Sequence, residues 1–299
     1  MDAILITGPT ASGKSALAAE LAQRHCGEVI NADSMQVYSV LDWLTARPRP
    51  EETRSAAHHL YGVVAPDEAF STGSWLRRVE PLLADIKARG KLPVFVGGTG
   101  LYFKALTGGL SEMPEIPEEV RASWRQRLVE EGAEALHAEL GRRDPVAAAT
   151  LNPADGQRIV RALEIHSVTG RSIRALQEAS GPALIDPAAA RKIILEPDRN
   201  LLHERINRRF KTMMEEGAVA EVEALLALGL PAAMPAMKAI GVAQIAEMLG
   251  GKITREEAIE RSSAATRQYA KRQSTWFRNQ MDASWTRIGS ASELGPLSA

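Results

Sequence analysis

Short apolar runs alternate with stretches of helical periodicity over the first 110 residues. The runs that predict strands lie at residues 3–6, 28–32, 92–96 and, with two histidines at its start, 58–64. Helical spacing of apolar residues follows the first run and precedes the third, where Ser71 is a suitable N-cap. Strand-like runs alternating with helical patterns are typical of a parallel sheet covered by helices, so we predict an α/β fold.

The pattern changes after Gly108 and Gly109. Residues 111–187 are rich in Ala, Glu and Arg and show only helical periodicity. A strand pattern returns at residues 191–197, and the chain is helical again from residue 201 to about residue 281. We therefore predict an α/β core domain formed by residues 1–110 and 188–299, interrupted by an all-helical inserted domain at 111–187.

Composition restricts the class of protein. The 299 residues are 45% hydrophobic and carry a formal net charge of −1, so a nucleic-acid site would have to come from local clusters of basic residues. One cysteine, Cys26, excludes an internal disulfide framework and suits a reducing compartment. The chain opens directly into a strand pattern and has no apolar stretch of membrane-spanning length. These features predict a cytoplasmic protein.

The most specific motif follows the first apolar run. Residues 8–15 match G-x-x-x-x-G-K-[ST] and lead into a helical pattern, which is the context that a phosphate-binding loop requires. Backbone N–H groups and the helix N-terminus would hold a di- or triphosphate, Lys14 would neutralise its terminal phosphate, and Ser15 could bind Mg²⁺. The residues of this loop are Gly8, Pro9, Thr10, Ala11, Ser12, Gly13, Lys14 and Ser15.

Two polar residues follow other predicted strands. Because ligands bind beyond the carboxyl ends of parallel strands, Asp33 is expected at the same edge of the sheet as the phosphate loop. Asp33 either accepts a proton from a nucleophile or caps a following helix. The hydroxyl of Thr99, after Gly97 and Gly98, either faces a ligand or caps a helix over residues 100–106.

The central strand lacks the acidic residue that usually holds magnesium in nucleotide hydrolases. The run at residues 92–96 ends in Gly97-Gly98-Thr99, without Asp or Glu. This disfavours an ATPase or a motor protein. Small-molecule kinases, and transferases with a diphosphate leaving group, remain as alternatives.

Basic residues cluster in two places. One stretch, 261–278, has no acidic residue and includes three aromatic side chains, and a second cluster lies in the helical insertion. Such clusters indicate either a solvated helix face or contacts with a nucleic-acid backbone. The basic residues are Arg261, Arg267, Lys271, Arg272 and Arg278 in the first cluster, and Arg158, Arg161, Arg171 and Arg174 in the second.

Five blocks in this order resemble the bacterial tRNA dimethylallyltransferase family, also called tRNA isopentenyltransferases. The resemblance covers residues 1 to about 288 and implies a P-loop NTPase-like core. The blocks are residues 8–15, Asp33-Ser34-Met35-Gln36-Val37-Tyr38, Gly97-Gly98-Thr99-Gly100-Leu101-Tyr102, Gln157-Arg158-Ile159-Val160-Arg161-Ala162-Leu163-Glu164, and residues 265–276 (Ala-Thr-Arg-Gln-Tyr-Ala-Lys-Arg-Gln-Ser-Thr-Trp).

The resemblance also implies an activity. Members transfer a dimethylallyl group from dimethylallyl diphosphate to N6 of the adenine 3′-adjacent to the anticodon, with Mg²⁺. It assigns the general base to Asp33, a hydrogen bond near the reacting amine to Thr99, and the diphosphate to the loop. The expected partner is the anticodon stem-loop of tRNA, bound by a monomer.

The resemblance and the basic clusters together give the expected tRNA contacts. The resemblance implies the contacts that follow the core strands and those in the insertion, and the late basic cluster adds Arg267, Lys271 and Arg272. They are Asp33, Ser34, Met35, Gln36, Thr99, Arg121, Gln157, Arg158, Ile159, Val160, Arg161, Arg267, Lys271 and Arg272. Three alternatives are a transferase acting on free AMP or ADP, a small-molecule kinase with a phosphate loop, and a non-enzymatic RNA-binding protein.

Two departures from the family pattern stand out. The family usually has two glycines in the loop after Tyr38, where this chain has Val40 and Leu44. Many relatives also carry Gly-Tyr-Arg where this chain reads Gly241-Val242-Ala243, so an arginine near the diphosphate is missing. Lys238 and Arg267 are the candidates to supply its charge.

Overall fold

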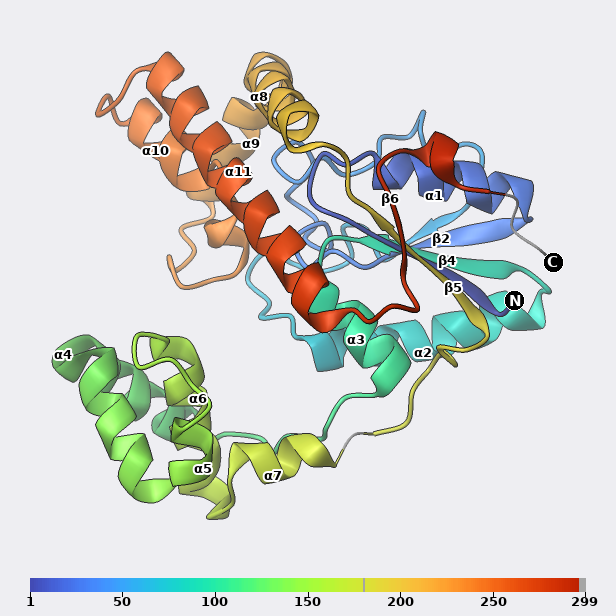
Figure 1. Ribbon diagram of the computed structural model, residues 1–299. Helices are drawn as coiled ribbons and strands as arrows, with labels where there is room; N and C mark the ends of the chain where they lie inside the picture. The colour runs from blue at the N-terminus through green and yellow to red at the C-terminus, as the bar shows by residue number, and fades with distance from the viewer. Residues whose placement is uncertain (180, 296–299) are drawn as a thin grey trace. The chain divides into compact units, whose positions relative to one another are not determined.

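The computed structural model describes residues 1–179 and 181–295. The chain divides into two compact units, one formed by Met1–Thr107 with Ile185–Ala299 and the other by Gly108–Leu184 (Figure 1). We call them the core unit and the helical unit.

A parallel sheet is the centre of the core unit. Within the described residues, six strands pair in the order β3-β2-β4-β1-β5-β6, every pair parallel. In the middle, Thr7 pairs with Gly97 on one side and with Ile194 on the other, so the three central strands end at one edge. The strands are β1 Ala3–Thr7, β2 Gly27–Asn31, β3 His58–His59, β4 Leu92–Gly97, β5 Ala190–Leu195 and β6 Thr286–Ile288.

Strand β1 is buried along its whole length, as expected for a strand whose two faces are both covered by helices. On one face, Ile4 and Ile6 pack in a cluster with Leu17 and Leu21 of α1 (Lys14–Arg24). The other face is aromatic. There, Trp75 of α2 (Thr72–Ala88) stacks on Tyr102 of α3 (Gly100–Gly108) at 4.3 Å between ring centroids.

The predicted α/β class is confirmed, and two local predictions need separate comment. Ser71 caps α2, because its hydroxyl accepts the backbone N–H of Ser74 at 3.1 Å. The strand predicted at residues 58–64 is wrong beyond His59. Leu60 and Gly62 have φ angles of 63° and 60°, and this left-handed backbone ends the extended segment.

Helices from the second half of the core unit pack together beside the edge of the sheet that carries the loops (Figure 1). Helix α11 lies along α8 and turns a stripe of small or polar side chains inward, from Ser262 and Thr266 to Gln273. These elements are α8 Arg199–Glu216, α9 Ala218–Ala227, η1 Ala236–Lys238, α10 Val242–Leu249 and α11 Arg255–Gln280. The short η2 (Ala291–Glu293) is separate from them and lies near α1 (Figure 1).

The helical unit has its own apolar core. Helix α4 (Glu118–Arg143) kinks at Gly132, where φ is 83°, and packs on α6 (Gly156–Thr169) through Trp124, Leu140 and Leu163. Two short helices complete it, α5 (Pro145–Ala148) and α7 (Ile173–Glu178). Across the part of the chain that the structure describes, no helix combines the length and hydropathy needed to span a membrane.

Candidate active site

The loop at residues 8–15 connects β1 to the first turn of α1. It curls through left-handed backbone at Ala11 and Gly13, with φ angles of 65° and 97°. The curl points N–H groups at the helix start toward one position, which favours an anion there. The Ser12 hydroxyl is buried and has no hydrogen-bond partner among the described residues, so the loop contains a polar atom that a phosphate oxygen would satisfy.

Lys14 begins α1, and its ammonium group donates to the Pro9 carbonyl at 3.3 Å. Burial lowers the pKa of Lys14 to about 8, Asp33 opposes that shift by its negative charge, and the positive charge of Arg209 adds to it. A charged lysine in this position gains a partner when an anion binds. This arrangement is typical of a cation reserved for a ligand.

Two arginines of α8 contact the phosphate loop, and the sequence reading did not identify them. Arg209 donates to the Thr10 hydroxyl at 2.6 Å, and Arg205 donates to the Ser12 carbonyl at 3.2 Å. Burial lowers the pKa of Arg209 to about 10, and Asp33 partly offsets this. Arg209 therefore brings a second, half-buried cation to the loop, from a position 199 residues away in sequence.

Asp33 lies in a turn directly after β2. Its Oδ1 accepts the Met35 N–H at 2.9 Å, and its own N–H donates to Asn31 Oδ1 at 2.9 Å. Residues 34–37 form turns, and the next helix along the chain is α2. The alternative that Asp33 caps a following helix is therefore wrong, and one carboxylate oxygen is left outside this turn.

Thr99 connects the turn of Asp33 to the end of β4. Its Oγ1 accepts the Ser34 N–H at 2.9 Å and donates to Ser34 Oγ at 3.2 Å. The Thr99 hydroxyl thus holds the backbone next to Asp33. Its hydrogen-bond partner, Ser34, directly follows Asp33 in the chain.

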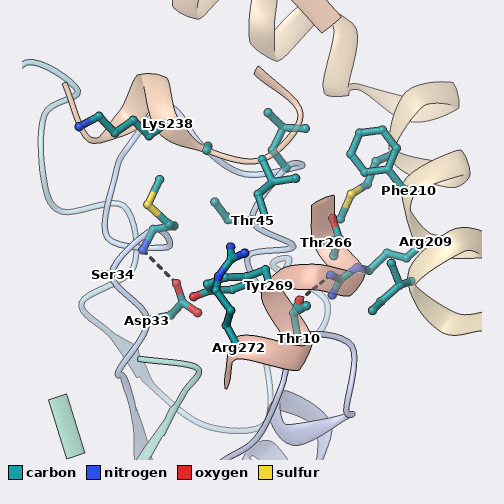
Figure 2. A pocket seen from close by; sticks show the side chains of 16 residues that line it. Thr10, Asp33, Ser34, Thr45, Arg209, Phe210, Lys238, Thr266, Tyr269 and Arg272 are labelled. Atoms are coloured by element: carbon teal, nitrogen blue, oxygen red, sulfur yellow. Dashed lines mark hydrogen bonds between the residues drawn. The ribbon is translucent and has the colours of Figure 1, made fainter. Parts of the chain in front are cut away.

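A cavity of about 300 Å³ opens beside these groups, and Thr10 is the residue of the phosphate loop that lines it. In Figure 2, Asp33 lies on one side and the hydrogen bond between Arg209 and Thr10 on the other. Burial, together with the charge of Asp33, raises the pKa of Tyr269 in its wall. The cavity is lined by polar Thr10, Asp33, Ser34, Thr45, Arg209, Lys238, Thr266, Tyr269 and Arg272, and by apolar Met35, Leu44, Ile206, Phe210, Met213, Ala239 and Ile240.

The loop that lacks the family glycines is held by side chains from elsewhere. The Glu221 carboxylate of α9 accepts the backbone N–H groups of Asp42, Trp43 and Leu44 at 2.7–3.0 Å. Leu44 reaches the cavity wall, and a Cβ at Gly241 would come within 2.6 Å of its side chain. The larger residue in the loop is therefore accommodated by a glycine opposite it.

The structure separates the two candidates for the missing arginine charge. Lys238 lines the cavity. Arg267 instead donates to Asn207 at 2.6 Å and to Glu260 at 3.1 Å, and it lines a different pocket, with Arg199 and Lys271. The cations that line the cavity are therefore Lys238, Arg209 and Arg272, and Arg267 is not among them.

The single-sign face predicted for the late basic cluster needs correction. Arg261 pairs with Glu247 of α10 at 3.3 Å, and Arg267 pairs with Glu260 at 3.1 Å. Acidic residues outside the 261–278 stretch therefore pair with two of the five basic residues of that cluster. Arg272 differs, because it lines the cavity with its guanidinium 5.6 Å from the Tyr269 ring.

In the helical unit, the predicted RNA contacts divide by exposure. Gln157 and Arg158 are exposed, Arg161 and Arg121 are half-buried, and the arginines form only weak local ion pairs. Ile159 and Val160 are 0% and 6% exposed, in the apolar core between α4 and α6. Their side chains hold the helical unit together, so the prediction of tRNA contacts at these two positions is wrong for the side chains.

The pKa of Lys14 leads to a pH prediction. Because this pKa is lowered to about 8, the ammonium charge is present below pH 8 and lost as the pH rises through it. Divided by the Kd of Lys14→Arg at the same pH, the wild-type Kd for inorganic diphosphate should be constant below pH 7 and increase by up to about tenfold per pH unit above pH 8. Calorimetry from pH 6.5 to 9.5 measures this.

Lys14→Arg is the matched control for the pH series, because arginine stays charged over the whole range. Ionisation of diphosphate itself affects both proteins equally. Parallel pH profiles for the two proteins would contradict the role assigned to the Lys14 charge.

Comparisons with known proteins agree with the site. The sequence profile of the IPP transferase family matches residues 36–280, and an isopentenyl transferase profile matches residues 1–62. The tRNA dimethylallyltransferase of Allorhizobium ampelinum is 65% identical over 97% of this chain and 95% of its own length, and that of Rhizobium meliloti is 63% identical over 99% and 97%.

Solved structures give the same result. The tRNA isopentenylpyrophosphate transferase of Bacillus halodurans matches with a TM-score of 0.67 and 37% identity, over 96% of this chain and 90% of its own. A eukaryotic dimethylallyltransferase acting on tRNA matches with a TM-score of 0.78 and 28% identity, over 92% of this chain and 69% of its own. The P-loop NTPase-like fold predicted from the resemblance is confirmed, and the chain belongs to the tRNA dimethylallyltransferase (tRNA isopentenyltransferase) family.

Proposed function

We propose that this enzyme transfers the dimethylallyl group of dimethylallyl diphosphate to N6 of the adenine 3′-adjacent to the anticodon of tRNA, releasing diphosphate. Family membership supports the reaction. The observation that carries it is the cavity, where a phosphate loop, a carboxylate and apolar side chains lie together. A five-carbon diphosphate needs an anion site and an apolar chamber, and an amine acceptor needs a base.

The chemistry follows from the two reactants. The adenine N6 lone pair is delocalised into the ring, so the amine is a poor nucleophile. As N6 forms a bond to C1 of the dimethylallyl group, the C1–O bond breaks and its electron pair leaves with diphosphate. Asp33 accepts the N6 proton through its carboxylate, and a positioned base of this kind contributes about 10²–10⁴ in rate. The Thr99 hydroxyl fixes the backbone beside Asp33, and we assign to it a hydrogen bond near the acceptor amine.

The leaving diphosphate is stabilised by groups that point at it before the reaction begins. The loop N–H groups, Lys14 and Arg209 supply positive charge where negative charge develops, an effect that is usually the largest single contribution to catalysis. Gly8, Pro9, Thr10, Ala11, Ser12 and Gly13 shape the loop, and the unpaired hydroxyl of Ser12 adds a donor.

Mg²⁺ fits this set of donors only when diphosphate is present. Among the described residues there is no group of three or more His, Cys, Asp or Glu side chains able to hold a metal ion. Magnesium typically binds through one or two protein oxygens plus substrate phosphates and water. The Ser15 hydroxyl would hold it here, and the bound ion would neutralise part of the diphosphate charge.

The acceptor base must leave the stack of the anticodon loop to enter the cavity. Unstacking costs about a few kcal/mol and less from a single-stranded loop than from a duplex. We assign contacts with the extruded adenine and its neighbours to Ser34, Met35 and Arg272, which line the cavity. Backbone contacts with tRNA are assigned to Gln36, Arg121, Gln157, Arg158, Arg161, Arg267 and Lys271. We further propose that the enzyme acts as a monomer in the cytoplasm.

The alternatives differ in their acceptor. The isopentenyl transferase profile covers only residues 1–62, which contain the phosphate loop and Asp33 and none of the helical unit, so it does not favour free AMP or ADP over tRNA. A small-molecule kinase would consume ATP. Incubating the enzyme with labelled dimethylallyl diphosphate, Mg²⁺ and either tRNA, AMP or ADP, followed by nucleoside analysis, shows which acceptor is used. A parallel incubation with ATP tests for a kinase. Label in AMP alone, or ATP consumption without transfer, would overturn the proposal.

The assigned tRNA contacts of the helical unit give a second prediction. Arg158→Ala and Arg161→Ala should each weaken tRNA binding and lower the slope of log affinity against log salt by about 0.7–0.9. The single-turnover rate at saturating tRNA should not change. Arg142→Ala is the control, because Arg142 is an exposed arginine of the same unit, ion-paired with Glu139. Unchanged affinity in both variants would contradict the role of α6.

A further inference from the structure

Gln273 of α11 is a buried polar side chain for which the reaction described above has no use. It is 6% exposed, on the face of α11 that packs inward. Its Oε1 accepts the N–H of Thr10 at 2.9 Å, and its Nε2 donates to the carbonyl of Gly98 at 2.9 Å. One amide therefore joins the phosphate loop to the end of β4, and both loops are held from a third element.

The glycines after β4 leave room for this contact. A Cβ at Gly98 would lie 2.2 Å from Gln273 Nε2, and a Cβ at Gly100 would lie 2.1 Å from the ring of Trp276, one turn further along α11. Real Cβ atoms do not approach other atoms this closely. Gly98 and Gly100 thus allow α11 to reach the backbone after β4, in addition to any approach of a ligand.

The contact continues to the carboxylate. Gly98 precedes Thr99, whose hydroxyl holds the Ser34 N–H, and Ser34 follows Asp33. A Cβ at Gly98 would also come within 3.3 Å of Asp33 Oδ2, so the Gln273 amide lies close behind the carboxylate. The chain of contacts from Thr10 through Gln273, Gly98 and Thr99 links the diphosphate side of the cavity to the base side.

We propose that Gln273 is a positioning residue that fixes the phosphate loop relative to Asp33. The inference rests on the proposed function, in which the leaving diphosphate and the proton acceptor act on opposite sides of the new C–N bond. Misplacing reacting groups by about 1 Å can cost 10²-fold in rate. Two hydrogen bonds to backbone, from one rigid helix, are suited to hold that separation.

Gln273→Met tests the proposal, because methionine keeps the length of the side chain and removes both hydrogen bonds. The single-turnover rate at saturating tRNA and dimethylallyl diphosphate should fall about tenfold or more, and the Kd for inorganic diphosphate should rise several-fold. The Kd for tRNA should stay within about twofold. Gln280→Met is the matched control, since Gln280 is exposed on the same helix and bonds only Lys104 among the described residues.

A purely structural glutamine would give a different result. It would lower the melting temperature but leave the single-turnover rate of the folded protein unchanged. Single-turnover rate and diphosphate affinity both within twofold of wild type would overturn the proposal. If wild type and Gln280→Met also fail to transfer, the proposed function has failed instead, and diphosphate affinity still reports on Gln273.

A second set of variants approaches the contact from its other side and does not depend on Gln273→Met folding. Gly98→Ala should displace the amide and slow the reaction by a similar factor. In a Gln273→Ala background the amide is gone and the new methyl group meets Asp33 Oδ2 at 3.3 Å, so adding Gly98→Ala should cost clearly less than it does in the wild-type protein. Independent, multiplying losses would show that the two residues do not act through one contact and would overturn the proposal.

Discussion

Asp33→Asn should lower the single-turnover rate of dimethylallyl transfer by about 10²–10⁴ while the affinity for tRNA stays within a few-fold of wild type. Asparagine has nearly the shape of aspartate, and its Oδ1 can still accept the Met35 N–H that stabilises the turn after β2. The substitution therefore removes the proton acceptor and leaves the backbone in place. Rapid-quench measurement with labelled dimethylallyl diphosphate and excess enzyme gives the rate of the chemical step.

The control for Asp33→Asn is Asp67→Asn, an exposed aspartate in the loop before α2. Its rate should equal that of wild type. If the rate of Asp33→Asn stays within a few-fold of wild type, the carboxylate only stabilises the turn after β2 through its hydrogen bond to Met35. Another group must then take the N6 proton. A lower affinity for tRNA with an unchanged rate would assign Asp33 to recognition.

The parts of the site that were predictable from sequence are those carried by local motifs. The phosphate loop is one contiguous segment, and the fixed spacing of its glycines and Lys14 predicts a phosphate ligand. Asp33 could be placed because parallel strands end at a common edge, so a polar residue after one strand lies near the loop after another. Both inferences need only the order of strands and helices along the chain.

The rest of the site depends on tertiary packing. Arg209 and Gln273 lie 199 and 263 residues from their partner Thr10, and nothing in the local pattern of α8 or α11 indicates that they turn toward the loop. Three arginines within residues 205–209 were the available signal, but basic residues on a helix are more often solvated. Only the packing of α8 and α11 beside the sheet selects which of them reach the cavity.

The errors have the same origin. Ile159 and Val160 stood within a block that resembles the family's RNA-contacting segment, but alternate faces of one helix serve different purposes. The face of α11 was predicted to carry charge of one sign because residues 261–278 contain no acid, but Glu260, seven residues before Arg267 on the same helix, pairs with it. Sequence proximity to a motif therefore predicts the element that carries a function better than the side chain that performs it.

Lys14→Ala should weaken the binding of inorganic diphosphate and of dimethylallyl diphosphate by about 10²–10³-fold, because it removes a half-buried cation that would pair with the anion. Arg209 remains on the loop, so weak binding should persist. Burial lowers the pKa of Lys14, which means that the folded protein without ligand disfavours its charge. Removing the ammonium should therefore not lower the melting temperature, and the loss of affinity would not reflect unfolding.

Calorimetry with inorganic diphosphate measures the effect of Lys14→Ala directly, and Lys91→Ala, an exposed lysine before β4, is the control. In Lys14→Ala the pH dependence expected above pH 8 should disappear together with the affinity, because both arise from one ammonium group. If the affinity falls but the dependence on pH persists, another group in the cavity carries the titration. If the affinity is unchanged, Arg209 and the loop N–H groups hold the diphosphate without Lys14, and the main anion site lies on the α8 side of the loop.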